Sequence, residues 1–263
     1  MKRAFAIVLA CWTIAARAED WQAKLTPPVL GAAPPMRLLH ATYRFGWSKF
    51  DAAVADFDYT KTKDGPLKLE VKTRTDGFVR KLWAMDATHT GLYVAATLRP
   101  LSSVQTEVYK KETLTTKLDF DATGVSRLRV SNPPDKNPPK TKRFEFPAVF
   151  ELYGALLFVR SQPLLKDETV RLVVYPATDP YLAEVKVAGR EKITVGKKGY
   201  DAVKLEIKLR RITKKLELEK HAKFKRATAW LSDDRDRLLL KIEAEVSVGK
   251  VWTEMQSVKF TEP

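Results

Sequence analysis

The chain has 263 residues, of which 30% are charged, and its 47 lysines and arginines outnumber its 32 aspartates and glutamates. This length fits one large β domain or two small ones, and a chain of this size buries roughly 70–75% of its unfolded surface. The single cysteine, Cys11, excludes an intramolecular disulfide, so folding depends on the core. The net charge of +15 favours anionic partners such as lipid headgroups, lipopolysaccharide, acidic polymers or acidic proteins.

Residues 1–18 have the three parts of a secretory signal peptide. Two basic residues open the chain, an apolar run follows, and Ala16 and Ala18 occupy the two positions that a signal peptidase reads. The apolar run is shorter than the about 20 residues that a membrane-spanning helix needs. We therefore predict cleavage before Glu19 and export to the periplasm of a bacterial envelope. A buried N-terminal helix is the alternative.

Cys11 leaves a second processing route open. It follows residues 8–10, Val-Leu-Ala, which loosely resemble a lipoprotein site where the cysteine becomes the lipidated N-terminus. Cleavage after residue 18 instead removes Cys11, leaves 245 of the 263 residues, and takes away three positive charges, so that +15 becomes +12. Nucleic acid is a usual partner of so basic a chain, but export argues against it.

The chain then divides into an extended lead-in and one β-rich domain. Residues 19–37 are rich in proline, which fixes φ and cannot donate to a strand ladder, so they predict the lead-in. In the domain, 38–263, apolar and polar residues alternate, which is typical of an antiparallel sheet with one dry face. The clearest strands are predicted at 39–47, 53–59, 67–73, 114–120, 125–130, 203–209, 240–248 and 251–260. We therefore predict a mainly β protein with a single curved antiparallel sheet, as an open barrel or a sandwich.

Two segments interrupt the alternation. Residues 131–142 are polar, basic and rich in proline, and they predict an exposed loop between strands. Residues 148–160 follow a proline and carry charge only at Glu151 and Arg160. A segment that is apolar on every side is buried on every side, so we predict one buried helix here, inside the concavity of the sheet. A buried pair of strands that turns at Gly154 is the alternative.

The chain shows no motif for catalysis or for a metal. His40, His89 and His221 are far apart and lack the spacing of a metal site. A nucleophile elbow, a phosphate loop and a dinucleotide fingerprint are all missing from the sequence. The acidic run 233–236 partly resembles a calcium loop, but it lacks the following glycine and the distant glutamate, so a charged hairpin turn is the simpler interpretation. We therefore predict no enzyme activity, no cofactor and no metal.

A basic stretch runs from Lys204 to Arg226. On paired strands its outward residues would form a positive stripe that contacts phosphates or carboxylates through charge-assisted hydrogen bonds. The alternative is a solvated sheet face whose lysines prevent edge pairing. The residues predicted to meet an anionic surface are Arg210, Lys214, Lys215, Lys223 and Lys225.

Several segments together carry a family resemblance. Residues 150–164 are an apolar stretch that runs into Arg-Ser-Gln-Pro-Leu, residues 230–237 read Trp-Leu-Ser-Asp-Asp-Arg-Asp-Arg, and a closing strand pair surrounds Gly249. Residues 97–100, Thr-Leu-Arg-Pro, add a strand-ending pattern. From about residue 38 to 260, this order resembles the bacterial exported family called domain of unknown function 3108. The proline-rich loop departs from the pattern and looks like an insertion. The resemblance implies an exported curved sheet or half-barrel and transfers no catalytic residues.

Three hypotheses for the function remain. The first is a non-enzymatic binding module whose concave face holds an apolar or lipid-like ligand, or a lipidated partner protein. The second, which applies if the helix fills the concavity, is a basic scaffold or docking protein on an anionic membrane or cell-wall surface. The third is a hydrolase whose site is not visible in the sequence. The residues predicted to line the apolar site are Tyr43, Phe45, Trp47, Phe57, Tyr59 and Trp83, with ordinary core as the alternative.

Overall fold

The computed structural model describes residues 20–61, 65–134, 138–220, 224–247 and 249–261. The predicted signal peptide and Cys11 therefore lie outside the described residues. The described chain is mainly β, as predicted, with the helices η1 (Gln22–Lys24), α1 (Gly77–Leu82) and α2 (Leu152–Ser161). The strands are β1 (Leu39–Trp47), β2 (Phe50–Lys61), β3 (Leu67–Thr75), β4 (Met85–Tyr93), β5 (Pro100–Tyr109), β6 (Thr113–Asp121), β7 (Gly124–Asn132), β8 (Lys142–Glu145), β9 (Val149–Phe150), β10 (Thr169–Val174), β11 (Tyr181–Val195), β12 (Lys198–Ile212), β13 (Leu218–Lys220), β14 (Phe224–Ser232), β15 (Leu239–Val246) and β16 (Lys250–Phe260).

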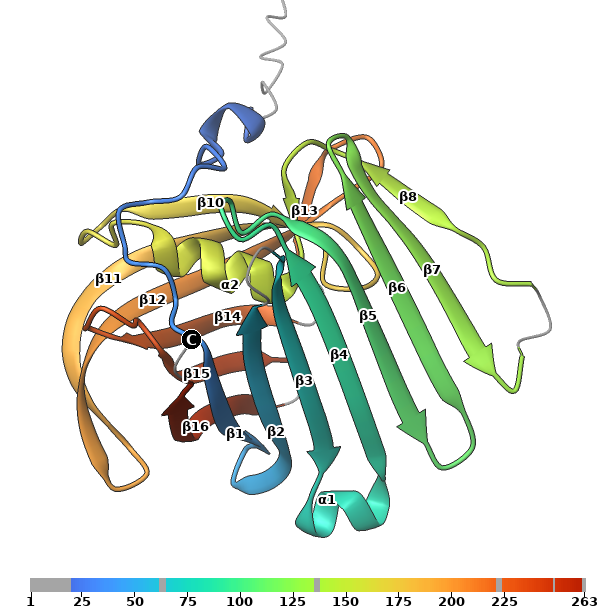
Figure 1. Cartoon of the computed structure of the whole chain (residues 1–263), viewed down its shortest axis with the longest axis horizontal. Coiled ribbons are helices and arrows are strands. Elements are labelled where there is room, and N and C mark those ends of the chain that lie inside the picture. Colours follow the sequence, from blue (N-terminus) through green and yellow to red (C-terminus); the bar gives the residue numbers. More distant parts are fainter. Residues whose placement is uncertain (1–19, 62–64, 135–137, 221–223, 248, 262–263) are drawn as a thin grey trace, which may run out of the picture.

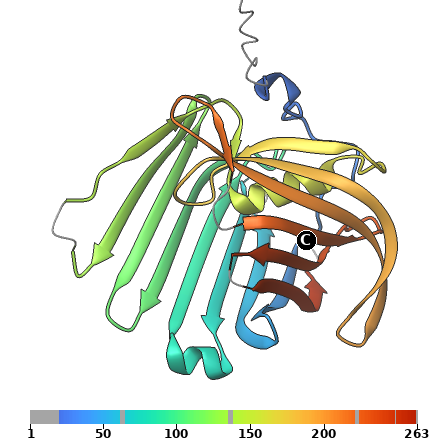
Figure 2. The same cartoon turned by 180° about the vertical axis from the view of Figure 1, so that it is seen from behind.

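All sixteen of these strands belong to one sheet. Their order is β8-β7-β6-β5-β4-β3-β2-β1-β16-β15-β14-β12-β11-β10-β9, with β13 paired to β12. Neighbours run antiparallel except β9 and β10, which are parallel over two residue pairs. Figures 1 and 2 show the sheet curling around α2. Because β8 and β9 are the two ends of this order, the sheet is curved but not closed, which confirms the predicted open architecture.

The two ends of the sheet share a core. Leu118 on β6 and Val125 on β7 are buried with Leu182 on β11 and Ile212 on β12. Burial of apolar surface therefore holds together strands that no ladder joins. This contact gives the open sheet the shape of a half-barrel.

The two-residue alternation predicts the buried face of the strands correctly. In β2, Ala55, Phe57 and Tyr59 are buried, whereas Asp56 and Asp58 between them are partly exposed. Successive side chains of a strand point to opposite faces, so a single pattern separates the inner layer from the outer one. The same alternation places apolar residues of β1 and β3 on the inner layer.

α2 is the predicted helix, but it begins at Leu152 and not at residue 148. The Glu151 side chain caps its first turn by accepting hydrogen bonds from the N–H groups of Tyr153 and Gly154. The two apolar residues before Glu151 form β9 instead, so the preceding proline does not open the helix. Sequence periodicity cannot locate this boundary, because β9 and α2 are equally apolar.

α2 lies in the concavity of the sheet, as predicted (Figure 1). Its Leu157 belongs to the core cluster of β1 to β3, and its Phe158 to the cluster of β10 to β12. The helix therefore joins two halves of the sheet that lie far apart in the strand order.

The lead-in packs against the sheet. Trp21 is buried, stacks on Phe146 with 5.4 Å between ring centroids, and donates from Nε1 to the Leu216 carbonyl (2.9 Å). The Thr26 N–H donates to the Arg171 carbonyl (2.9 Å) on β10, beyond the two residues that β9 covers. The lead-in thus protects part of an edge strand from pairing with other chains.

The proline-rich loop is shorter than the predicted 131–142. β7 continues through Asn132 and β8 begins at Lys142, so strands take both ends of that range. Residues 133, 134 and 138–141 are exposed, and 135–137 lie outside the described residues.

Candidate functional site

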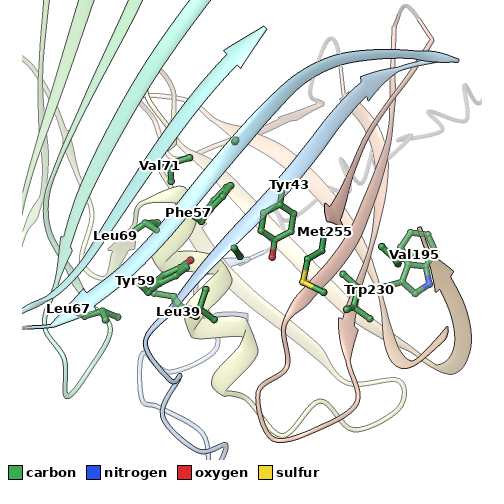
Figure 3. Close-up of a cluster of buried hydrophobic side chains, with 14 of the residues drawn as sticks. Leu39, Tyr43, Phe57, Tyr59, Leu67, Leu69, Val71, Val195, Trp230 and Met255 are labelled. Carbon is green, nitrogen blue, oxygen red and sulfur yellow. The ribbon is translucent and has the colours of Figure 1, made fainter. Parts of the chain in front are cut away.

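Three of the residues predicted to line an apolar site lie in the core beneath α2. Tyr43, Phe57 and Tyr59 are buried, and Figure 3 shows them on one side of β1 and β2 with the ribbon of α2 behind. The Phe57 ring contacts the ring of Tyr43 (4.9 Å between centroids) and that of Tyr153 on α2 (5.7 Å). Phe45 is half-buried and packs against the same cluster. These four residues therefore form core, which was the alternative interpretation.

The space that remains between these residues and α2 is small. The cavity has a volume of about 40 Å³ and is lined by residues such as Tyr59, Leu157 and Arg160. By comparison, an apolar cavity of about 150 Å³ binds benzene. α2 therefore fills the concavity at this place, and a whole lipid chain does not fit between helix and sheet.

Glu151 anchors the start of α2 inside the sheet. It is 1% exposed, and its Oε2 accepts hydrogen bonds from the Tyr93 hydroxyl (2.6 Å) and from the N–H groups of Tyr153 (2.9 Å) and Gly154 (3.0 Å). Its Oε1 lies 3.5 Å from Nε2 of the buried His89. Burial raises the pKa of Glu151 and lowers the pKa of His89 to about 4. Both shifts favour uncharged forms, which suits this pair to holding the helix in place.

Sequence reasoning missed this buried cluster. The available signal was Glu151 itself, a single acid in an apolar stretch, because a buried carboxylate requires hydrogen-bond donors. Its partners could not be read from the chain, since Tyr93 lies 58 residues away.

Arg160 anchors the other end of α2. It is 4% exposed, and its Nε donates to the carbonyl oxygen of Asp236 (2.7 Å). Nη1 of Arg237 donates in return to the Arg160 carbonyl (2.7 Å) and to that of Gln162. The Asp236 carboxylate itself binds Arg37, whose Nε donates to Oδ1 (2.8 Å). Burial lowers the pKa of Arg160, and the charge of Asp236 opposes that shift.

The acidic run between β14 and β15 is a hairpin turn, in agreement with the simpler interpretation. Oδ1 of Asp234 accepts hydrogen bonds from the Ser232 hydroxyl (2.8 Å) and from the N–H groups of Asp236 (2.9 Å) and Arg237 (3.0 Å). Among the described residues, no group of three or more acidic, histidine or cysteine side chains is arranged to hold a metal ion. The same part of the chain has no helix that is long and apolar enough to cross a membrane.

The other two residues predicted for the apolar site, Trp47 and Trp83, lie outside the core. Trp47 is 46% exposed at the end of β1, and Trp83 is exposed directly after α1. Both belong to the edge of the sheet that is remote from α2 in Figure 1. The structure therefore does not bring them together with Tyr43. In β1 the register with β2 shifts between Phe45 and Gly46, and Gly46 is buried whereas Trp47 is exposed; Trp83 lies after α1 and outside the strands.

Trp47 and Trp83 are part of a row of exposed apolar side chains. We define the aromatic rim as residues 47–50 around the β1–β2 turn, 77–83 in and after α1, and 109–111 at the β5–β6 turn. Phe78 is 62% exposed and Leu82 is 73% exposed. The exposed large apolar residues of the rim are Trp47, Phe50, Phe78, Leu82 and Trp83.

Contacts between neighbouring elements make the rim continuous. The Asp76 N–H, just before α1, donates to the Ala52 carbonyl on β2 (2.9 Å). On the other side of α1, the Trp83 ring faces the Tyr109 ring with 5.8 Å between centroids. Both overall views place the β1–β2 turn, α1 and the β5–β6 turn along the same edge (Figures 1 and 2).

Exposed lysines accompany the apolar side chains of the rim. They are Lys49, Lys81, Lys110 and Lys111. Glu112 follows the last two, so that turn keeps one net positive charge. A mixture of aromatic and basic side chains is typical of surfaces that meet a lipid headgroup region.

Acidic side chains near the rim are bound by neighbours. Asp86 accepts two hydrogen bonds from Arg80 (2.9 and 3.0 Å), and Asp51 accepts one from Arg44 (2.6 Å). The Asp76 carboxylate accepts a hydrogen bond from the first N–H of α1 (2.8 Å). The lysines of the rim therefore face few unbound carboxylates.

The predicted positive stripe is partly neutralised by ion pairs. Nη2 of Arg210 lies 3.3 Å from Oε2 of Glu184, which also pairs with Arg171 (3.2 Å). Arg226 pairs with Glu245 (2.7 Å). The structure places the lysines predicted to meet an anionic surface differently. Lys214 and Lys215 are exposed between β12 and β13. Lys225 is described only as a member of β14, and Lys223 lies outside the described residues.

A family model described as protein of unknown function (DUF3108) matches residues 42–256. The chain belongs to this family. The match confirms the resemblance drawn from the sequence, and it covers both anchors of α2 as well as the aromatic rim. No curated protein matches this DUF3108 chain.

One solved structure supports the fold of this chain, and two others resemble it more weakly. A β-barrel-like protein of domain of unknown function DUF1849 from Brucella abortus is 8% identical, with a TM-score of 0.58 over 88% of this chain and 100% of that one. Two others have a TM-score of 0.36 over 88% of this chain and 99% of theirs: a candidate exported protein with a YmcC-like fold from Bacteroides fragilis (5% identity) and a candidate lipoprotein from Parabacteroides distasonis (9% identity). The first likeness shows the β-barrel-like fold alone.

Proposed function

We propose that this protein is a non-enzymatic docking module of the bacterial cell envelope that binds an anionic lipid surface through the aromatic rim. The observation that carries this proposal is the gathering of exposed aromatic and aliphatic side chains, with lysines among them, along one edge of the sheet. Contiguous exposed apolar patches are uncommon on soluble monomers and mark interaction sites. The proposal keeps the second hypothesis from the sequence and moves its surface from the 204–226 stretch to the rim.

The chemistry of the rim fits a lipid headgroup region. Aromatic side chains such as those of Trp47 and Trp83 favour the boundary between headgroups and acyl chains. Phe78 and Leu82 are four residues apart in α1, so they share one helix face and enter that boundary together. Each lysine near an anionic membrane contributes about 1 kcal/mol of attraction.

The interior offers less support for the other two hypotheses. The cavity of about 40 Å³ beside α2 is too small for a lipid chain, so the first hypothesis lacks an open concavity there. Glu151 and His89 are a buried acid and base 3.5 Å apart, but Glu151 caps α2 and holds it within the sheet. We therefore propose a binding function without catalysis.

The proposed location is the periplasm, and it rests on the predicted signal peptide, residues 1–18. Export would present the rim to the lipid leaflets that face the periplasm. If Cys11 is lipidated instead, the rim would act as a second contact beside the acyl chains, and stable membrane attachment commonly takes two such signals.

Sedimentation with lipid vesicles tests the proposal. The purified protein is mixed with phosphatidylcholine vesicles that contain or lack phosphatidylglycerol, whose anionic headgroups create a negative surface potential. We expect binding to the anionic vesicles and a loss of about tenfold or more in the double variant Phe78→Ser and Leu82→Ser, since each buried side chain contributes roughly 1.5–3 kcal/mol.

The matched control replaces two apolar side chains of similar exposure elsewhere, Val29→Ser with Leu165→Ser. This control variant is expected to bind as the parent does. Equal binding of the rim variant and the control variant would refute docking through the rim.

A further inference from the structure

The small cavity beside α2 has a buried floor and an apolar mouth. The floor includes the buried residues Tyr43, Phe57, Tyr59, Leu157 and Arg160. The partly exposed apolar residues of the lining, Met36, Leu156, Leu238 and Leu239, form the mouth, and the cation Arg237 lies among them. The cavity is therefore a narrow funnel that leads from apolar side chains at the surface to a buried cation.

Arg160 forms no ion pair with a carboxylate among the described residues, although the charges of Asp236 and Asp234 act on it. Its Nε is bound to a backbone carbonyl, and its Nη2 is buried without a hydrogen-bond partner. The nearby Asp236 carboxylate binds Arg37, and Asp234 Oδ1 accepts hydrogen bonds within its own turn. A buried charge without a bound counter-ion is unfavourable, so this floor favours an anion.

Tyr59 adds a second donor to the floor. Its side chain is buried, lines the same cavity, and interacts electrostatically with Arg160. Burial raises the pKa of Tyr59, so the hydroxyl keeps its proton and can donate a hydrogen bond. A guanidinium and a hydroxyl that belong to the lining of one small space are donors of the kind that bind a carboxylate.

We propose that this funnel binds the carboxylate of a single-chain amphiphile, with Arg160 and Tyr59 as its donors. The volume of about 40 Å³ exceeds the roughly 10–15 Å³ that one water needs and is below that of a benzene site, so it admits a carboxylate headgroup without its chain. The alkyl chain leaves through the mouth, where Met36, Leu156 and Leu238 offer apolar contact. This site is separate from the aromatic rim and does not depend on docking.

Isothermal titration calorimetry with decanoate and decanol tests the proposal. The two probes share an alkyl chain and differ in the headgroup, and both are used below their aggregation limits with the full purified protein. We expect decanoate to bind and decanol to bind at least about tenfold more weakly, because hydrogen bonds to charged groups are worth about 1.5–3 kcal/mol. Sodium chloride at matched ionic strength separates carboxylate binding from simple anion binding.

Two variants test whether Tyr59 and Arg160 donate hydrogen bonds to the carboxylate. Tyr59→Phe keeps the ring in the core, and we expect it to weaken decanoate about fivefold and to leave decanol unchanged. Arg160→Met is expected to abolish the preference for decanoate, and its circular dichroism spectrum reports whether it folds. Vesicle sedimentation of Tyr59→Phe should match the parent protein, since Tyr59 is remote from the rim.

Three outcomes would overturn the proposal. In the first, neither decanoate nor decanol binds, and the cavity holds ordered water only. In the second, both probes bind equally, which would assign the affinity to the chain alone. In the third, Tyr59→Phe folds and binds decanoate as tightly as the parent does. Because Tyr59→Phe preserves core volume, this third outcome remains decisive if Arg160→Met does not fold.

Discussion

The hydroxyl of Tyr93 donates a 2.6 Å hydrogen bond to the carboxylate of Glu151, across 58 residues of sequence. Tyr93 ends β4, and Glu151 is the N-cap of α2, so this bond joins the sheet to the first turn of the helix. Both side chains are buried, and a hydrogen bond in such surroundings is stronger than one at the surface. The position of α2 within the concavity thus depends on a contact between two distant parts of the chain.

The first prediction concerns the Tyr93 hydroxyl. We expect Tyr93→Phe to lower the free energy of unfolding by about 1–3 kcal/mol, because it leaves a buried carboxylate with one donor fewer. Urea denaturation followed by tryptophan fluorescence measures the change. Tyr200→Phe is the control, since Tyr200 is partly exposed on β12, and it should change stability by less than about 0.5 kcal/mol. Equal effects of the two substitutions would show that the bond to Glu151 contributes nothing.

A second prediction concerns Gly154 in α2. Replacing glycine with alanine inside a helix normally stabilises it by about 0.5–1 kcal/mol. At Gly154 an added Cβ would lie 2.9 Å from Cε1 of Tyr93, whose hydroxyl is held by Glu151. We therefore expect Gly154→Ala to destabilise the protein by about 1–3 kcal/mol in thermal denaturation. Gly199→Ala is the matched control, because its Cβ would meet nothing within 4 Å, and a gain of stability in both variants would contradict the prediction.

The third prediction is a dependence of stability on pH. Burial lowers the pKa of His89 to about 4 from its ordinary value of 6.5, so the unfolded chain takes up a proton at higher pH than the folded protein does. The contribution of His89 to the free energy of unfolding is therefore fully present above pH 6.5. It falls as the pH drops toward 4, by about 3 kcal/mol at most. Glu151 faces His89 and acts in the opposite sense, because its raised pKa makes its contribution fall as the pH rises.

Comparison of the parent with His89→Gln isolates the pH-dependent contribution of His89 to the free energy of unfolding. Urea denaturation at several pH values between 4.5 and 7.5 should give a difference in unfolding free energy that shrinks as the pH falls. The difference between the two proteins removes the contributions of surface carboxylates, which both share. A difference that is constant over this range would mean that His89 titrates normally in the folded protein.

A fourth prediction separates the aromatic rim from the predicted stripe by charge. Lys110 with Lys111 and Lys214 with Lys215 are adjacent exposed pairs in two turns, so they form a matched comparison. We expect Lys110→Gln with Lys111→Gln to weaken binding to phosphatidylglycerol vesicles by roughly 10–30-fold at low salt, at about 1 kcal/mol per lysine. The Lys214→Gln and Lys215→Gln control should change binding by less than about threefold, since those lysines lie outside the rim.

Salt provides the second readout for the same variants. Raising the ionic strength from 0.01 to 0.15 M shortens the screening length from about 30 Å to about 8 Å. The difference in vesicle affinity between the parent and the 110–111 variant should therefore become smaller. If the 214–215 variant loses more vesicle affinity than the 110–111 variant, the basic stretch predicted from the sequence, and not the aromatic rim, binds the anionic lipid.

The strand alternation made most of the fold predictable. Phe57 and Tyr59 fall on the buried face of β2, as the pattern requires, because successive side chains of a strand point to opposite faces. The apolar run around Leu157 likewise predicted a buried helix in the concavity, and only its first residues proved to be a strand. The family match and the open sheet agree with these predictions.

The candidate sites were less predictable. Trp47 shares the pattern of Tyr43 in the sequence, but the register of β1 with β2 shifts between Phe45 and Gly46, and Trp47 is exposed. Arg210 reads as a free cation in the sequence, yet Glu184 on the neighbouring strand lies 3.3 Å away. In both cases the outcome depends on the register of pairing with a neighbouring strand, which local patterns do not encode.

The sequence by itself determined the two faces of most strands, and therefore an antiparallel sheet with one apolar helix, because alternation is a property of neighbouring residues. Only the tertiary structure decided that α2 fills the concavity beside Tyr59, that Glu151 and Arg160 hold its two ends, and that Trp47, Phe50, Phe78 and Trp83 are exposed in one rim. The bonds from Tyr93 to Glu151 and from Arg160 to Asp236 span 58 and 76 residues. Such partners are chosen by strand order and register, which local patterns do not encode.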